Sequence, residues 1–136
     1  MGAGLIVDTS ALLAAAFAEP QRDAVLIALS EAGRVRMSSC CLLESSIVAA
    51  SRLGARGQAE LGMLLDAFDV EIASFTPELA FLAVDAWERF GKGRHPAGLN
   101  IIDCCSYALA AQTCEPLLAV GGDFERTDIQ LVELIS

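Results

Sequence analysis

The chain has 136 residues, with 18 acidic and 9 basic side chains and a formal net charge of −9. This length suits one domain with a single core, so residues 1–136 are treated as one unit. The acidic balance lacks the overall basic surface of a nucleic-acid-binding domain. The longest apolar run, residues 11–18, is too short to span a membrane, and no basic segment precedes an apolar stretch as in a signal peptide. We therefore expect a soluble cytoplasmic protein without a membrane contact.

The first third of the chain is predicted to form two strands and two helices. Residues 5–7 are a short apolar run that predicts a buried strand, and Asp8 ends it. Residues 11–17 and 21–32 predict two helices separated by a proline break. Residues 34–37 predict the second strand.

The middle of the chain is predicted to hold two helices and a third strand. The helices run from about Cys41 to Leu53 and from Gln58 to Phe68, with Gly54 and Gly57 marking a break between them. Residues 70–74 alternate weakly and predict a strand.

The last third is predicted to hold two helices, a glycine-rich loop between them and two strands. In chain order these are the helix 77–90, the loop 91–98, the helix 101–112, the strand 116–120 and a closing edge strand at 129–135. Asn100 is a favourable cap for the second helix. The alternation of strands and helices predicts a three-layer α/β/α sandwich with a mainly parallel central sheet of four to five strands.

The five cysteines do not suggest a disulfide framework. Their number is odd, and four of them stand in two adjacent pairs, Cys40-Cys41 and Cys104-Cys105. The single histidine also argues against a zinc site. We expect small buried thiols in a reducing compartment.

Four acidic residues lie where strands end or where the following helices begin. Asp8 follows the first strand, and Glu44 lies early in the helix after the second strand. Asp103 lies in the first turn of its helix, and Asp123 comes just after the next strand. In a parallel sheet these positions share one edge. We expect the four carboxylates to converge there, with Asp103 included if the glycine-rich loop carries the chain back across the domain.

Each acid alone has a simple explanation as a helix cap or as a first-turn charge that meets the helix dipole. Four like charges on one edge raise one another's pKa, and a divalent cation would neutralise them. Oxygen ligands with almost no histidine favour Mg²⁺ or Mn²⁺ over zinc. Such an ion polarises a phosphoryl oxygen and lowers the pKa of bound water, as phosphodiester hydrolysis requires.

Among the acids that follow the 116–120 strand, Asp123 is expected to lie nearest the sheet edge. It comes three residues after Val120, and the Gly121-Gly122 turn allows positive φ values that can fold the carboxylate back. Asp128 lies further along and is expected to pair with Arg126 or to cap a turn.

The basic residues are few, but three of them, Arg89, Lys92 and Arg94, lie within six residues of one another. They are either a solvated cluster at a helix C-terminus, where cations are favoured, or contacts for an anionic substrate.

Five motifs, in the same order along the chain, together resemble PIN-domain ribonucleases of the VapC toxin type. They are Val7-Asp8-Thr9-Ser10-Ala11-Leu12, Leu43-Glu44, residues 91–100, residues 103–110 and Gly121-Gly122-Asp123-Phe124. The run from Gly91 to Tyr107 is the most specific, whereas Asp-Thr-Ser-Ala alone would be weak.

The resemblance implies a Mg²⁺-dependent endoribonuclease, with Mn²⁺ able to substitute, that cleaves RNA and arrests translation. It also implies a homodimer and a small VapB-like antitoxin that holds the enzyme inactive. By motif matching, the catalytic and metal-binding residues are Asp8, Glu44, Asp103 and Asp123. Thr9 or Ser10 would assist at the first acid, and the expected substrate-binding residues are Thr9, Ser10, Lys92, Arg94 and Asn100.

The chain departs from the usual pattern of this family at three positions. Ile102 stands where glycine is common, Gly122 where Asn or Asp is common, and Val120 where lysine is frequent. None of these removes an acid. We expect them to affect RNA affinity or target choice more than chemistry.

Two other classes of function remain open from the residues. A phosphatase of the haloacid-dehalogenase type would use Asp8 as its nucleophile, but it needs a second Asp where this chain has Ser10. A non-catalytic binding module would use the acids only as caps. A phosphate-binding loop at Gly91-Lys92-Gly93 fails because the required spacing is missing, and no dinucleotide-binding glycine motif follows the first strand. We favour the metal nuclease, with the phosphatase second.

Overall fold

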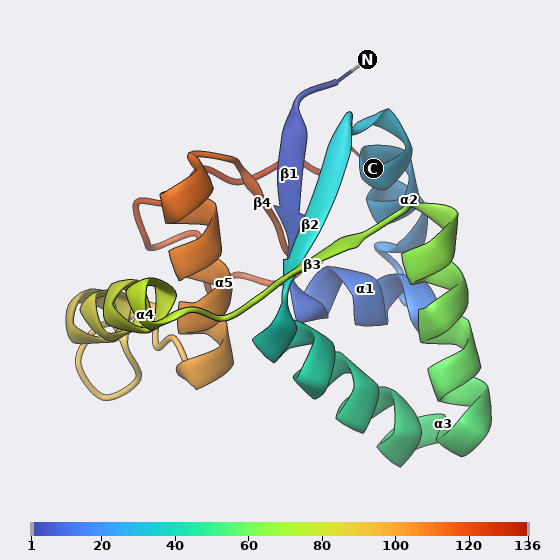
Figure 1. Cartoon of the computed structure of the whole chain (residues 1–136), viewed down its shortest axis with the longest axis horizontal. Coiled ribbons are helices and arrows are strands. Elements are labelled where there is room, and N and C mark those ends of the chain that lie inside the picture. The colour runs from blue at the N-terminus through green and yellow to red at the C-terminus, as the bar shows by residue number, and fades with distance from the viewer. Residues whose placement is uncertain (1, 136) are drawn as a thin grey trace.

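A computed structural model describes residues 2–135 as strands that alternate with helices (Figure 1). In chain order the elements are β1 (Gly4–Val7), α1 (Thr9–Ala16), α2 (Arg22–Glu31), β2 (Arg34–Ser38), α3 (Ser39–Ala67), β3 (Glu71–Ala73), α4 (Pro77–Phe90), α5 (Ile101–Thr113) and β4 (Leu117–Leu118). No helix within residues 2–135 is long and apolar enough to cross a lipid bilayer.

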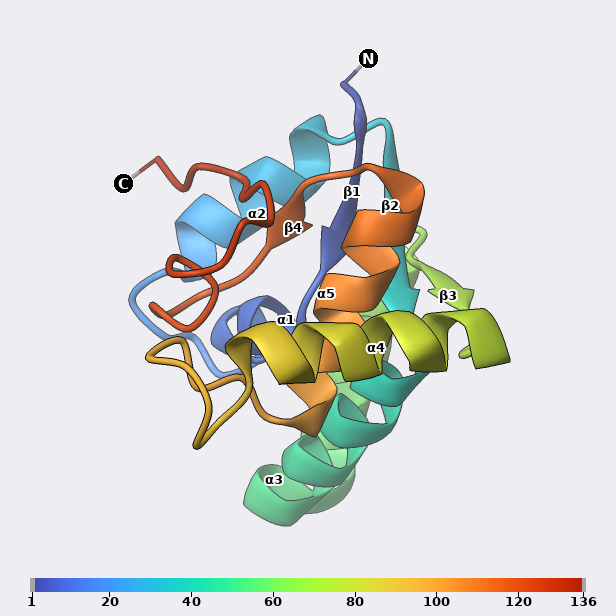
Figure 2. The same cartoon turned by 90° about the vertical axis from the view of Figure 1, so that its left-hand side faces the viewer.

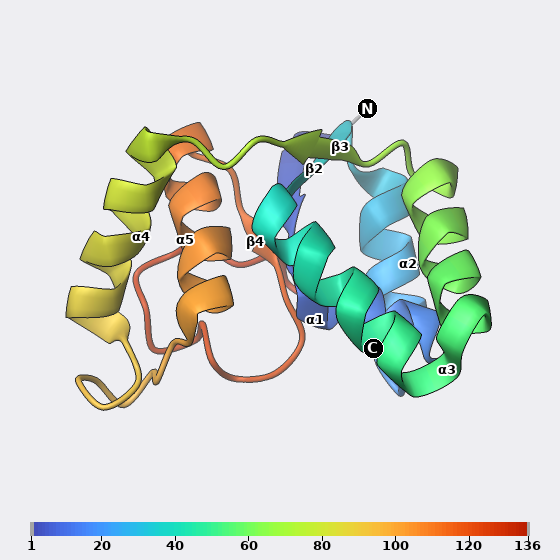
Figure 3. The same ribbon diagram turned by 60° about the horizontal axis from the view of Figure 1, so that its bottom comes forward.

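The four strands form one sheet in the order β3-β2-β1-β4, and every neighbouring pair is parallel. Helices α4 and α5 cover one face of this sheet, and α1, α2 and α3 cover the other (Figures 1 and 3). The predicted three-layer α/β/α sandwich is therefore confirmed, and its sheet has four strands.

Strand β1 lies at the centre of the sheet and contributes to both cores. Leu5 and Val7 pack into the cluster under α1, α2 and α3, whereas Ile6 packs into the cluster under α4 and α5. Successive side chains of a strand point to opposite faces, so a strand covered on both sides needs an uninterrupted apolar sequence. Asp8 is the first polar residue after this run.

The prediction of a closing strand at residues 129–135 is wrong. One parallel bridge joins Leu131 to Leu117, where the amides of Leu117 and Val132 donate to the carbonyls of Gln130 and Leu117. The alternating apolar pattern has another cause, because Leu131 packs against the cluster on the α5 side and Val132 against the cluster on the α2 side. This segment thus closes both cores without forming a strand.

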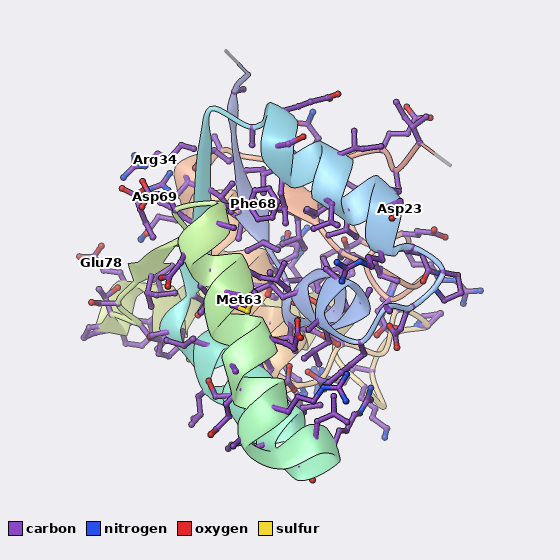
Figure 4. The ribbon with its side chains drawn as sticks, turned by 90° about the vertical axis from the view of Figure 1, so that its right-hand side faces the viewer. Asp23, Arg34, Met63, Phe68, Asp69 and Glu78 are labelled. Atoms are coloured by element: carbon purple, nitrogen blue, oxygen red, sulfur yellow. The ribbon has the colours of Figure 1, made fainter. Side chains whose placement is uncertain are left out.

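Helix α3 is bent into two arms at Gly54, whose φ is 58° and ψ is −137° (Figure 3). The predicted break is therefore confirmed at this residue. Figure 4 shows the second arm, which carries the exposed Met63 and ends at Ala67, just before Phe68. Gly57 lies inside the bend, where a Cβ atom would come within 2.2 Å of the Ala49 carbonyl oxygen.

We predict that Gly57→Ala lowers the free energy of unfolding by about 1–3 kcal/mol, because a backbone oxygen blocks the added methyl group. Gly62 lies in the second arm with no atom within 4 Å of the corresponding Cβ position. Gly62→Ala should therefore raise the free energy of unfolding by about 0.5–1 kcal/mol through helix propensity. Urea denaturation of both variants measures the contrast, and equal effects would show that the bend is not closely packed.

Candidate active site

The carboxyl edge of the sheet gathers the starts of three helices. Helices α1 and α3 begin directly where β1 and β2 end, and α5 begins at the same edge (Figure 1). The loop between α4 and α5 thus carries the chain back across the domain, as the sequence required for Asp103.

Asp8 is the N-cap of α1 and is almost fully buried, at 3% exposure. Its Oδ2 accepts hydrogen bonds from the Ser10 amide at 3.0 Å and the Ser10 hydroxyl at 2.7 Å. Its Oδ1 accepts a third from the Ser106 hydroxyl at 2.5 Å. Capping of α1 therefore explains only the hydrogen bonds to Oδ2, because Oδ1 is bound by a side chain of α5.

Buried hydroxyl groups extend this contact to the neighbouring elements. The Ser10 hydroxyl accepts from the Val120 amide at 3.0 Å, which ties the start of α1 to the chain after β4. The Ser106 hydroxyl lies 2.9 Å from the Cys41 Sγ of α3. Thr9 donates to the Cys41 carbonyl oxygen, so Ser10 is the hydroxyl residue that contacts Asp8.

Sequence reasoning missed Ser106. It is completely buried, and its only signal in the sequence is a hydroxyl within the otherwise apolar face of residues 104–110. Its partner Asp8 is 98 residues away in the chain, so no local pattern could have paired them.

Asp103 and Asn100 form a capping box at the start of α5. The Asn100 Oδ1 accepts from the Asp103 amide at 2.8 Å, and the Asp103 Oδ2 accepts from the Asn100 amide at 3.1 Å. The side-chain carbonyl oxygen of Asn100 is thus engaged in this cap, while the residue as a whole remains exposed.

The pKa of Asp103 is raised to about 7, first by burial and then by the charges of Asp8, Asp123 and Glu44, against the opposing Asn100 hydrogen bond. The structure therefore places Asp8, Asp123 and Glu44 near enough for their charges to act on Asp103. Glu44 is half-buried on α3, and Asp123 is exposed on the loop after β4. Gly121 turns that loop with a φ of 100°, and the buried Phe124 anchors it.

These carboxylates match a hard divalent cation by the chemistry of their donor atoms. Asp8 Oδ1 accepts a single hydrogen bond and keeps a lone pair, and Asp103 Oδ1 accepts none from residues 2–135. Over the same described residues, no three Asp, Glu, His or Cys side chains stand already assembled around a common metal position. The acids are neighbours, and a cation would have to draw their oxygens together.

The predicted basic contacts lie on the loop that leads into α5. Lys92 is exposed, and the Arg94 guanidinium lies 4.7 Å above the Trp87 ring while its Nε donates to the Glu88 carbonyl oxygen. Arg94 is therefore partly ordered by α4.

Asp128 has partners that differ from the expected Arg126 pair or turn cap. Its Oδ2 accepts from Arg89 Nη2 at 2.6 Å, and its Oδ1 accepts from the Tyr107 hydroxyl. Both oxygens are directed to α4 and α5.

The cysteine side chains match the expected buried thiols in part. Cys41, Cys104 and Cys105 are buried, whereas Cys40 is half-buried and Cys114 is exposed at the end of α5. Burial raises the pKa of Cys41 to about 12, with a contribution from the Asp8 charge, so its thiol stays neutral. All five are free.

Comparison with protein families matches residues 5–130 to the PIN domain. Ribonuclease VapC30 of Mycobacterium tuberculosis is 40% identical over 96% of this chain and 99% of its own length. Ribonuclease VapC of Mycolicibacterium smegmatis is 40% identical over 94% and 99%. The chain therefore belongs to the PIN-domain family, and its relatives there are VapC ribonucleases.

Solved structures share the fold. Mycobacterium tuberculosis VapC20, described as a toxin that cleaves the sarcin-ricin loop, gives a TM-score of 0.76 at 20% identity over 94% of this chain and 98% of its own. The VapBC2 complex of Rickettsia felis, bound to a promoter DNA fragment, gives 0.75 at 16% identity over 96% and 97%.

We predict that metal-free protein gains stability from Asp103→Asn at pH 8 but not at pH 5. The folded-state pKa of Asp103, about 7, lies above its ordinary value of 3.8, so the folded state binds the proton more tightly. Its contribution to stability is present below pH 4 and is lost as pH rises through 7. The melting temperatures of Asp103→Asn and of the unmodified protein, measured in chelator from pH 5 to pH 8, test this prediction. Asp66→Asn, at an exposed acid of α3, is the control, and a pH-independent loss of stability in Asp103→Asn would show that Asp103 is only a cap.

Proposed function

We propose that the protein is a Mg²⁺-dependent endoribonuclease and the toxin of a type II toxin–antitoxin pair. The observation that carries this proposal is the group of carboxylates around Asp103 at the carboxyl edge of the sheet. The ribonuclease names of relatives that are 40% identical over nearly the whole chain support the same conclusion.

In this proposal Asp8, Glu44, Asp103 and Asp123 hold the ion. When bound, Mg²⁺ or Mn²⁺ supplies a polarised phosphoryl oxygen and a water of lowered pKa. Ser10 and Ser106 fix the orientation of the Asp8 carboxylate through hydrogen bonds to its two oxygens. Below pH 7 the proton held by Asp103 competes with the cation. Metal binding should therefore strengthen as pH rises through neutrality.

A nucleophilic role for Asp8, as in the phosphatase alternative, agrees poorly with the geometry. Only 3% of the residue is exposed, and Ser10 stands where this chemistry needs a second Asp. A purely structural role for the four acids would leave their mutual repulsion without any compensating use.

The proposed partners are RNA, a VapB-like antitoxin and a second copy of the chain. Two structural neighbours, from Rickettsia felis and Klebsiella pneumoniae, are a VapBC assembly and a toxin–antitoxin complex. For the homodimer, an apolar groove of about 580 Å³ lies between the start of α3, α4 and α5 and includes Phe75, Trp87 and Ile101. Ile101 is 76% exposed, and a second copy would cover it. A cytoplasmic location follows from the RNA substrate.

We predict that the purified protein cleaves RNA with Mg²⁺ or Mn²⁺ and stops in chelator. Asp8→Asn and Asp103→Asn should each lower the single-turnover rate by about 100-fold or more, because the charge that holds the ion is lost. Circular dichroism should show that both variants remain folded. Undiminished cleavage in excess chelator, with a contaminating nuclease excluded, would contradict the proposal.

We also predict that Lys92→Glu and Arg94→Glu weaken RNA binding without changing Mn²⁺ affinity. Each should flatten the salt dependence of binding by about one counterion, because a phosphate contact releases its counterion. Arg56→Glu on α3 changes the same charge on another surface and serves as the control. A salt slope equal to that of the control would mean that the loop is only solvated.

A further inference from the structure

The loop from Ala119 to Gln130 carries Asp123 and is held at three places. Near its start, the Val120 amide donates to the Ser10 hydroxyl. In its middle, Phe124 is buried at 4% exposure in the cluster on the α5 side of the sheet. Near its end, Asp128 binds side chains of α4 and α5. We propose that Tyr107 and Asp128 are positioning residues that hold this loop so that Asp123 faces Asp103.

Tyr107 is a rigid anchor because its ring is packed in the core. The residue is 5% exposed, and its ring centroid lies 5.8 Å from that of Phe90. Its hydroxyl reaches out of the core and donates to Asp128 Oδ1. A tyrosine fixed by its ring and bonded by its hydroxyl tolerates little movement of the group that it binds.

Arg89 completes the contact from α4. Its Nη2 donates to Asp128 Oδ2 at 2.6 Å, and its Nη1 donates to the Tyr107 hydroxyl at 3.2 Å. The arginine side chain is 45% exposed, so this ion pair is weaker than its geometry suggests. Each Asp128 oxygen thus has a partner on α4 or α5, so this carboxylate ties the loop to both helices.

Tyr107 follows Asp103 by four residues on α5, so both side chains lie on one face of the same helix. The contact with Asp128 therefore sets the loop in place against the element that carries Asp103. Figure 2 shows the loop beside α5 and near the last turn of α4.

The short segment between Phe124 and Asp128 transmits this restraint. The Thr127 amide and hydroxyl both donate to the Phe124 carbonyl oxygen, at 3.1 and 2.7 Å. A tight turn of this kind makes Phe124 move with Asp128, and Asp123 is the residue next to Phe124.

Hydrogen exchange and Mn²⁺ titration of Tyr107→Phe and Asp128→Ala test the proposal, which rests on the proposed metal-binding role of Asp123. Tyr107→Phe keeps the packed ring and removes only the hydroxyl. Asp85→Asn is the matched control, because Asp85 faces Arg89 at 3.6 Å without touching the loop. Measurements are made well below the melting temperature of every variant, so that all are folded.

We predict that both variants speed hydrogen exchange of the loop amides at least about tenfold and weaken Mn²⁺ binding about tenfold. The single-turnover rate should fall by about the same factor as Mn²⁺ affinity. KM for RNA should not change. The control should match the unmodified protein. Faster exchange with unchanged Mn²⁺ affinity would reduce the contact to a structural one and overturn the proposal. Unchanged exchange in both variants would overturn it as well.

Asp123→Asn distinguishes this proposal from the proposed function. It should weaken Mn²⁺ binding more than Asp128→Ala does, since it removes a ligand rather than its support. Full Mn²⁺ affinity in Asp123→Asn would show that Asp123 is not a ligand, which overturns its place in the metal site, while loop exchange still reports on the Tyr107 contact. A greater loss of affinity in Asp128→Ala than in Asp123→Asn would make Asp128 the ligand and overturn the positioning role.

Discussion

The burial of the Asp8 carboxylate is the constraint on which the rest of the structure depends. Removing an ionised group from water costs several kcal/mol unless hydrogen bonds replace its hydration. Here the replacement comes from Ser10, from Ser106 and from the positive end of the α1 dipole. Because these donors belong to α1 and α5, and because Ser10 also binds the Val120 amide, the start of α1, helix α5 and the chain after β4 have to meet at this point.

Asp103 shows how structural and chemical demands share one residue. As the last member of a capping box it stabilises the start of α5, and that role fixes where its carboxylate lies. The same position buries it and brings it near three other acids, so its pKa rises to about 7 and its charged form opposes folding. A site that gathers like charges is a typical place where stability is reduced for function, and the cation of the proposed function would offset that cost.

The arrangement of the four acids could be predicted because it follows from topology. Once the strands are parallel, Asp8 and Glu44 share an edge whatever the details of packing, and the capping signal at Asn100 places Asp103 there too. The contacts of Ser106 and Tyr107 could not be predicted, because both residues lie in an apolar helix and bind partners distant in the chain. The alternation at 129–135 led to the wrong prediction of a strand for a related reason. Side chains that pack on two cores produce the pattern of a strand, although only one bridge, at Leu131, joins the segment to the sheet.

The candidate site therefore combines a rigid half with a half that depends on a loop. Asp8 and Asp103 are held at the start of helices, Asp8 by backbone and hydroxyl donors and Asp103 by the Asn100 amide. Asp123 stands after two glycines and is exposed, so only the contacts on either side of it limit its movement. Gly122, which stands where the resemblance leads one to expect Asn or Asp, supplies no side chain to restrain the loop locally. The restraint has to come from Phe124 in the core and from Asp128 on Tyr107, so the geometry of this half is set by residues of α4 and α5 that never reach the site.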